Sequence, residues 1–254
     1  MDVNKNTYTF IFAIIMVVVV AAILSSTYIK LKPLQDKNVE LEKKQNILSS
    51  IGVYILRDSA DIIYPNYIKE ELVINYDGEK LDGSAFDVDL ATEIKKNKEQ
   101  KILPLFISEV NNEKKYIIPL RGTGLWGPIW GFIALENDLN TVYGAVFDHK
   151  AETPGLGAEI NRSFFEDQFA GKNIFDSGKL VSITVKKGGA AADALHEVDG
   201  ISGGTITSDG VTNMLIERLN MYLPYLENIK IEQEVKSIML DMDSVPSIKD
   251  SIIH

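Results

Sequence analysis

Hydrophobic residues follow two different patterns along the chain, and the first is an unbroken run near its start. Every residue from Phe10 to Leu24 is apolar, and the uncharged stretch from Tyr8 to Ser26 around this run has 19 residues. At about 1.5 Å per residue, this stretch forms a helix of roughly 28 Å. The hydrocarbon core of a bilayer is about 30 Å thick. The pattern therefore predicts a membrane-spanning helix at 8–28.

A cleavable signal peptide is the alternative for this segment. Such a peptide has an apolar region of about 7–15 residues that ends in a small-x-small cleavage site. The residues from Leu24 to Tyr28 contain no Ala-x-Ala motif. We therefore expect an anchor that stays on the protein.

The charges beside the anchor bear on its orientation. Lys30, Lys32 and Lys37 follow it, whereas Asp2 and Lys5 precede it. By the positive-inside rule this distribution mildly favours a cytoplasmic C-terminal domain.

The second pattern, beyond the anchor, is one of short apolar segments. Pro33 marks the exit from the membrane, and mixed apolar and charged residues at 39–48 predict a short helix there. Strand-like segments then recur, the first running into an Asp-Gly turn that suits a hairpin. The predicted strands are 72–78, 101–110, 115–120, 129–135, 141–148 and 179–186.

Two helices interrupt this β pattern, one near 162–170 and one that starts around Asp209. The fold class is therefore α+β, a single transmembrane helix followed by a domain with a mainly antiparallel sheet and few helices. The predicted divisions are a tail (1–7), the anchor (8–28), a membrane-exit helix or linker (29–53), the α+β domain (54–230) and a C-terminal tail (231–254).

Composition excludes several kinds of chemistry. Cysteine is absent, so disulfides, thiolate metal sites and a cysteine nucleophile are excluded. The three histidines are not spaced for a shared helix face, and we expect no metal site. The net charge of −10 repels phosphate backbones, so nucleic acid is not an expected partner.

The glycines Gly122, Gly124 and Gly127 formally match the dinucleotide-binding pattern. That pattern needs a helix immediately afterwards, to present its N-terminus to the pyrophosphate. Here the strand-like segment 129–135 follows, so we expect a turn that lets Trp126 lie close to the backbone.

Acidic residues occur in two groups that suggest no catalytic site by their spacing. The first group, Asp82, Asp87 and Asp89, lacks the ligand pattern of a calcium-binding EF-hand. The second group is expected at exposed helix edges or strand rims, and its members are Glu152, Glu159, Glu166 and Asp167.

Two glycine-rich segments are candidates for ligand binding. Pro154 to Gly157 allows tight turns and close approach of the backbone to a ligand. In 199–211 small and hydroxyl residues precede a helical pattern, with Ser208 or Asp209 as the natural N-cap. A phosphate here would meet free amides and the positive end of the helix dipole, and Lys186 and Lys187 could supply charge. A serine-rich helix cap without any ligand would have the same sequence.

The segment Asp199-x-x-Ser202-Gly203-Gly204-Thr205 resembles the Asp-x-x-Ser/Thr-Gly-Ala-Thr motif of FMN-binding domains with covalently attached flavin. Gly204 replaces the usual alanine, and the smaller residue should not block attachment. The resemblance implies that a flavin transferase esterifies Thr205 to the phosphate of FMN, which gives a phosphothreonyl-FMN.

Further segments extend the resemblance over nearly the whole chain. Arg121–Gly131 and Glu152–Gly157 are similar to two other signatures of this family, and Asn6–Phe10 and Leu31–Pro33 are similar to its anchor and exit. The chain thus resembles C subunits of Na⁺-translocating NADH:quinone oxidoreductases. The alternatives are the related G subunit of Rnf complexes and a membrane-anchored extracytoplasmic binding module without flavin.

The resemblance implies a flavoprotein electron carrier within a multi-subunit membrane translocase. It would relay electrons from NADH toward ubiquinone or another quinone, with the NADH, quinone and Na⁺ sites in other subunits. Its partners would be those subunits, a flavin transferase and the lipid bilayer. The folded domain would lie on the periplasmic side of the bacterial inner membrane, against the charge distribution beside the anchor.

The resemblance also assigns roles to residues, none of them catalytic and none a metal ligand. Trp126 and Leu156 would lie near the isoalloxazine ring, Glu152 and Thr153 would contact polar atoms of FMN, and Lys187 would lie near its phosphate or ribityl chain. His149 and His196 are expected to be structural. The complete set of predicted cofactor-binding residues is Thr205, Trp126, Glu152, Thr153, Leu156, Gly157, Lys187, Ser202, Gly203 and Gly204.

Overall fold

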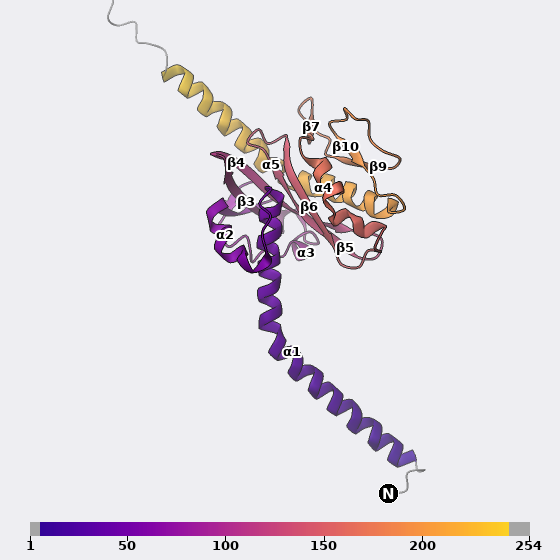
Figure 1. Cartoon of the computed structure of the whole chain (residues 1–254). Helices are drawn as coiled ribbons and strands as arrows, with labels where there is room; N and C mark the ends of the chain where they lie inside the picture. Colours follow the sequence, from indigo (N-terminus) through magenta and orange to yellow (C-terminus); the bar gives the residue numbers. More distant parts are fainter. Residues whose placement is uncertain (1–5, 244–254) are drawn as a thin grey trace, which may run out of the picture. The chain divides into compact units, whose positions relative to one another are not determined.

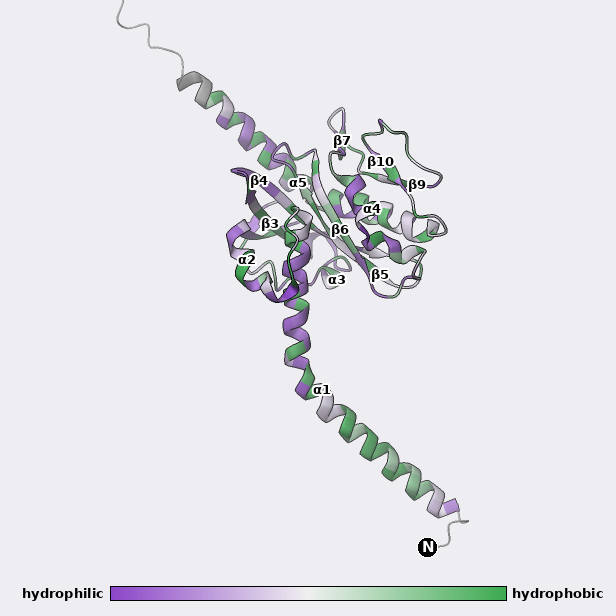
Figure 2. Cartoon of the chain, in the orientation of Figure 1, coloured by the Kyte–Doolittle hydropathy of each residue, from purple (hydrophilic) through white to green (hydrophobic). Residues whose placement is uncertain are grey.

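The computed structural model describes residues 6–243, which form two compact units with the boundary between Lys44 and Gln45. The first unit is part of helix α1 (Asn6–Ser50), whose apolar segment is exposed and is long enough to cross a membrane. Figure 2 shows this segment as a continuous hydrophobic stretch of the helix. The expected long apolar helix is therefore present.

Helix α1 runs through Pro33 without a break, so the chain does not form an anchor and a separate short helix as the sequence suggested. A proline removes one backbone hydrogen bond, and an exposed helix can bend there without ending. Two ion pairs at i, i+4 spacing accompany the continuous helix: Lys32 with Asp36 at 3.1 Å spans Pro33, and Glu40 with Lys44 at 2.6 Å follows it.

The second unit is built on a six-stranded antiparallel sheet (Figure 1). Five of the strands overlap with predicted ones, and the predicted Asp77-Gly78 turn lies between β1 and β2, with Gly78 at φ +84°. In spatial order the strands are β2 (Lys80–Leu81), β1 (Ile68–Asn75), β3 (Ile102–Val110), β4 (Glu113–Thr123), β5 (Pro128–Leu135) and β6 (Val142–His149).

Helices and short strands complete this unit. The helices are α2 (Ala60–Tyr67), α3 (Leu90–Glu93), α4 (Ser163–Glu166) and α5 (Thr205–Asp243), with 3₁₀ turns at Arg57–Ser59, Lys98–Gln100, Gly157–Asn161 and Asp167–Phe169. The short strands are β7 (Phe175–Asp176), β8 (Lys179–Leu180), β9 (Thr184–Lys186) and β10 (Glu197–Asp199).

The strand predicted at 179–186 is instead two short strands, β8 and β9. Ser182 between them has a φ of +62°, which turns the chain out of the extended conformation. This turn lets β9 pair in parallel with β10, which leads directly into the glycine-rich segment after Asp199.

Both faces of the sheet are covered, which explains why its strands are apolar on both sides. On one face Ile47 and Ile51 of α1 pack with Phe106 and Phe132. On the other face α5 packs against alternate residues of the same strands. The Tyr222 hydroxyl of α5 donates a 2.7 Å hydrogen bond to the carbonyl of Pro104 in β3.

Two glycine contacts place the start of α5 beside the turn between β4 and β5. A Cβ on Gly122 would lie 2.7 Å from the side chain of Met214, and one on Gly210 would lie 2.4 Å from the carbonyl oxygen of Thr123. Such distances are too short for real Cβ atoms, so the helix and the turn approach each other as closely as their backbones permit.

Candidate functional site

Helix α5 begins at Thr205, so the prediction that Ser208 or Asp209 caps it is wrong. Its first turn is closed by the Ser208 amide, which donates to the carbonyl of Gly204 at 2.9 Å. The Ser208 hydroxyl accepts from the Ile201 amide at 3.2 Å, because residues 201–204 fold back over the first turn. The residue that precedes the helix is therefore Gly204.

This start presents backbone donors around Thr205. The amides of Thr205, Ile206 and Thr207 come before the first i→i−4 bond, so they have no acceptor within the helix. Gly203 makes the preceding turn with a φ of +72°, which a residue with a side chain rarely adopts. Three amides at the N-terminus of a 39-residue helix form a site suited to an anion.

Glu152 connects three parts of the chain at this point. It is only 5% exposed, which corrects the expectation of an exposed edge. Its Oε1 accepts from the Trp126 amide at 2.8 Å, and its Oε2 accepts from the Thr207 hydroxyl at 2.6 Å. These donors lie 26 residues before and 55 residues after it, so only the folded chain brings them together.

Two glycines make room for the Glu152 carboxylate. A Cβ on Gly124 would lie 2.6 Å from its Oε1, and a Cβ on Gly157 would lie 2.5 Å from its Oε2 and 2.3 Å from the Thr207 hydroxyl. Gly124 and Gly157 therefore both leave space for the same buried carboxylate, that of Glu152.

Beside this carboxylate lies a cavity of about 210 Å³. It brings together seven of the predicted site residues and three that sequence reasoning missed, Leu125, Ile206 and Thr207. The available signal was that Ile206 directly follows Thr205 in the glycine-rich segment. The predicted residues in this cavity are Glu152, Thr153, Leu156, Gly157, Gly203, Gly204 and Thr205.

A second cavity, of about 400 Å³, lies on the other side of Thr205. Lys187, Ser202, Gly203 and Thr205 line it, together with Gly188, Gly189, Asp199, Gly200, Ile201, Val185, Ser208 and Asp209. Gly203 and Thr205 line both cavities, so the two cavities meet at these residues.

The two neighbouring lysines have different surroundings. Lys186 forms an ion pair with Glu197 at 2.8 Å, whereas Lys187 lines the second cavity. Asp199 accepts from the Ala190 amide at 2.7 Å and so holds the loop that carries Lys187. The first residue of the Asp-x-x-Ser-Gly-Gly-Thr segment therefore positions this loop.

Trp126 and the two histidines lie outside the walls of these cavities. The indole of Trp126 is 65% exposed, and the residue is held through its backbone amide. His149 accepts from the Glu152 amide through Nδ1 at 3.2 Å, and His196 Nδ1 lies 2.7 Å from the carbonyl oxygen of Asn173. Both histidines therefore support local backbone structure. In the described part of the chain no three His, Asp or Glu residues gather into a metal-binding group.

The fold and this site define an FMN-binding domain. Residues 124–220 match the model of the FMN-binding domain family. That range contains the turn at Gly124, the Glu152 segment and the start of α5.

Comparison with individual proteins is more specific. The C subunit of the Na⁺-translocating NADH-quinone reductase of Haemophilus ducreyi is 31% identical over 248 residues, 89% of this chain and 96% of that protein. The C subunit of the Vibrio vulnificus enzyme is 34% identical over 210 residues, 76% of this chain and 82% of that protein. The chain therefore belongs to the family formed by the C subunits of Na⁺-translocating NADH-quinone reductases.

Solved structures agree with this assignment. The C subunit from Parabacteroides distasonis has a TM-score of 0.73 at 44% identity, covering 77% of this chain and 96% of that one. NqrC of Shewanella oneidensis has a TM-score of 0.65 at 27% identity, covering 78% and 99%. The expected α+β fold is thereby confirmed.

The residues present fit FMN. Free amides and Lys187 suit the phosphate, and polar groups of Thr153 and Glu152 border the first cavity. The side chains of Leu125, Leu156 and Ile206 offer apolar surface to a flat ring system, each between 41% and 56% exposed. Gly157 and Gly203 keep the space between these groups open, because a Cβ on either would meet neighbouring side chains.

Proposed function

We propose that this chain is the electron-transfer subunit of a membrane Na⁺-pumping NADH-quinone reductase and carries FMN esterified through its phosphate to Thr205. One observation carries the attachment: Thr205 is the first residue of α5 and the hydroxyl-bearing residue that lines both cavities. A phosphate on its Oγ1 lies within the reach of the free amides of the same turn.

The environment of Thr205 favours a phosphodiester. An anion at a helix N-terminus is stabilised by about 0.3–1 kcal/mol at an exposed site, and Lys187 adds a positive charge at the same cavity. Forming the ester joins Oγ1 to phosphorus and releases the hydroxyl proton. A flavin transferase must supply the activated flavin phosphate and its leaving group, because the chain offers neither.

The remaining site residues hold and orient the cofactor. When bound, FMN supplies the one-electron and two-electron redox chemistry, and protein contacts set its position and potential. Leu156, Leu125 and the exposed indole of Trp126 supply apolar contacts for the ring, and Thr153 and Glu152 supply polar ones. No residue of this chain is needed as a general acid or base in an electron relay.

Helix α1 anchors the electron-transfer domain in the membrane that holds the other subunits of the reductase. Helix α1 crosses the membrane and the folded domain lies on the periplasmic side, with the other subunits of the reductase as partners. Membership of this family favours a periplasmic domain more strongly than the three lysines after the anchor favour a cytoplasmic one. The NADH, quinone and Na⁺ sites belong to those other subunits, and electrons pass from NADH toward quinone through the flavin held here.

The test is whether flavin stays with the unfolded chain. The full-length protein is produced in a host with a flavin transferase, denatured and precipitated, and its in-gel flavin fluorescence is recorded. We expect fluorescence in the wild type and in Thr205→Ser, which keeps a hydroxyl, and none in Thr205→Val. Peptide mass mapping should place FMN on residue 205.

Two results would contradict the proposal. Fluorescence retained by Thr205→Val would place the attachment elsewhere. A colourless wild type from a competent host would favour a membrane-anchored binding module without flavin.

A further inference from the structure

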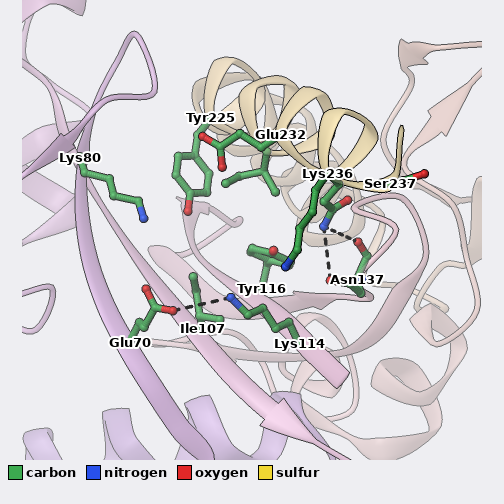
Figure 3. Close-up of a pocket in the computed structure, with 12 residues that line it drawn as sticks. Glu70, Lys80, Ile107, Lys114, Tyr116, Asn137, Tyr225, Glu232, Lys236 and Ser237 are labelled. Atoms are coloured by element: carbon green, nitrogen blue, oxygen red, sulfur yellow. Dashed lines mark hydrogen bonds and ion pairs between the residues drawn. The ribbon is translucent and has the colours of Figure 1, made fainter. Parts of the chain in front are cut away.

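A further cavity in the folded unit lies away from Thr205. It has a volume of about 550 Å³ and is bounded by α5, β1, β2, β3, β4 and the residue Asn137 after β5 (Figure 3). It shares no lining residue with either cavity at Thr205. Its size falls within the 300–1,000 Å³ of typical small-molecule sites.

Tyr225 gives this cavity an unused hydrogen-bond donor. The residue is 2% exposed and its hydroxyl has no hydrogen-bond partner. Figure 3 shows its ring pointing from α5 into the cavity, with the hydroxyl at the inner end. Tyr222, three residues earlier on the same helix, donates to Pro104 instead. Because a buried hydroxyl without a partner is destabilising, a group that accepts from Tyr225 would relieve this cost.

The charged side chains that line this cavity carry a net positive charge. Lys114 pairs with Glu70 at 3.8 Å. Lys80 and Lys236 line the cavity and make no ion pair with any described residue. The lining holds three lysines and two glutamates in all, so one positive charge remains uncompensated. Burial raises the pKa of Tyr225, with further contributions from Tyr116 and the carboxylates of Glu70 and Glu232, which keeps the phenol protonated and able to donate at neutral pH.

Two carboxylates line the cavity, Glu70 and Glu232, and of these only Glu232 makes no ion pair with a described residue. Glu70 is already paired, and the Gln233 side-chain amide donates to the carbonyl oxygen of Asn137 at 3.2 Å. Burial likewise raises the pKa of Tyr116, a second neutral phenol in the lining. Ile107 and Ile229 add apolar surface beside these donors.

We propose that this cavity binds a small organic oxyanion, a carboxylate or a phosphate monoester, through the Tyr225 hydroxyl and the ammonium groups of Lys80 and Lys236. The two isoleucines contact the organic part of the ligand. The site is separate from the flavin attachment, so it does not depend on the function proposed above.

The experiment compares Tyr225 with its matched control Tyr222. Full-length protein in detergent is titrated with acetate, succinate, inorganic phosphate and glycerol 3-phosphate at constant ionic strength, with chloride as the reference. Thermal unfolding is followed, because a ligand that binds the folded state raises Tm in a saturable way. The carboxylate and phosphate series identify which head group the site takes.

We expect at least one probe to raise the wild-type Tm saturably and Tyr225→Phe to weaken that response at least fivefold. Without any probe, Tyr225→Phe should unfold at the same or a higher temperature than the wild type, since it removes only an unpartnered hydroxyl. Tyr222→Phe should lower Tm yet keep the response to the probe. Lys80→Met should weaken the response as Tyr225→Phe does.

The proposal is overturned if no probe acts beyond the chloride reference, which would leave the cavity to water. It is equally overturned if Tyr225→Phe responds with wild-type affinity. A response that is lost in Lys187→Ala but kept in Tyr225→Phe would assign the anion to the flavin phosphate site instead.

Discussion

The Thr207 hydroxyl donates a 2.6 Å hydrogen bond to Oε2 of Glu152, and both side chains are buried. This bond joins the first turn of α5 to the segment that carries Leu156. Thr205 lies two residues before Thr207 in the same turn. The position of the proposed attachment residue relative to the ring-contacting segment therefore depends on this pair.

Replacing Thr207 by valine should destabilise the domain by about 1–3 kcal/mol. The change keeps the shape of the side chain but leaves a buried carboxylate oxygen without its donor. Thr207→Ser keeps the hydroxyl and should retain most of the stability. Urea unfolding followed by circular dichroism measures both variants. Equal stability of Thr207→Val and the wild type would show that the bond contributes nothing.

Gly157→Ala should reduce both the stability and the flavin content of the protein. The new Cβ would lie 2.3 Å from the Thr207 hydroxyl and 2.5 Å from Glu152, so one of the two must move. Gly127→Ala is the matched control in the neighbouring turn, since its Cβ would find only the Lys150 Cβ, at 3.8 Å. The flavin-to-protein absorbance ratio and Tm are the measurements. If the two variants behave alike, the close packing around Glu152 is not required.

Lys187→Ala should slow flavin attachment, whereas Lys186→Ala should leave its rate unchanged. Lys187 lines the cavity beside Thr205, and Lys186 is engaged with Glu197 at the surface. Losing such an exposed ion pair costs about 0–1 kcal/mol. The rate of appearance of in-gel flavin fluorescence with purified transferase distinguishes the two. Equal rates would remove Lys187 from the phosphate site.

Glu166 should make the stability of the domain depend on pH. Burial raises the pKa of Glu166 to about 7, and the nearby carboxylates of Asp167 and Asp148 also raise it. The hydrogen bond that Glu166 accepts from the Phe147 amide, at 2.7 Å, lowers this pKa. At a pH between the ordinary pKa of a glutamate and about 7, Glu166 therefore keeps its proton in the folded state but has lost it in the unfolded chain. Stability should fall as pH rises through this window, by up to about 1.4 kcal/mol per pH unit, and stay level above it.

Glu166→Gln should flatten this dependence, because the amide oxygen can still accept from Phe147 but has no proton to lose. Chemical unfolding between pH 4.5 and 8 measures the slope for both proteins. A slope in the variant equal to that of the wild type would assign the dependence to other groups.

The sequence was sufficient for most of the architecture. The apolar run at 10–24 lies in the long exposed helix that it predicted, and the apolar strand segments with the Asp77-Gly78 turn appear close to where their local pattern placed them. Local patterns succeed here because period, turn chemistry and length act over a few residues. They failed at Ser182 and at the start of α5, where contacts with β10 and with Ile201 decide the backbone path.

The candidate flavin site shows the same difference between what local sequence patterns predict and what tertiary contacts decide. By itself the sequence determined the cluster of glycines and hydroxyl residues before a helix, and with it the resemblance that singled out Thr205. Only the tertiary structure decided that Glu152 is buried, that Thr207 and the Trp126 amide are its donors, and that Tyr225 lines a cavity with an unpartnered hydroxyl. These facts depend on which distant segments the sheet and α5 bring within hydrogen-bonding distance, and no local pattern carries that information.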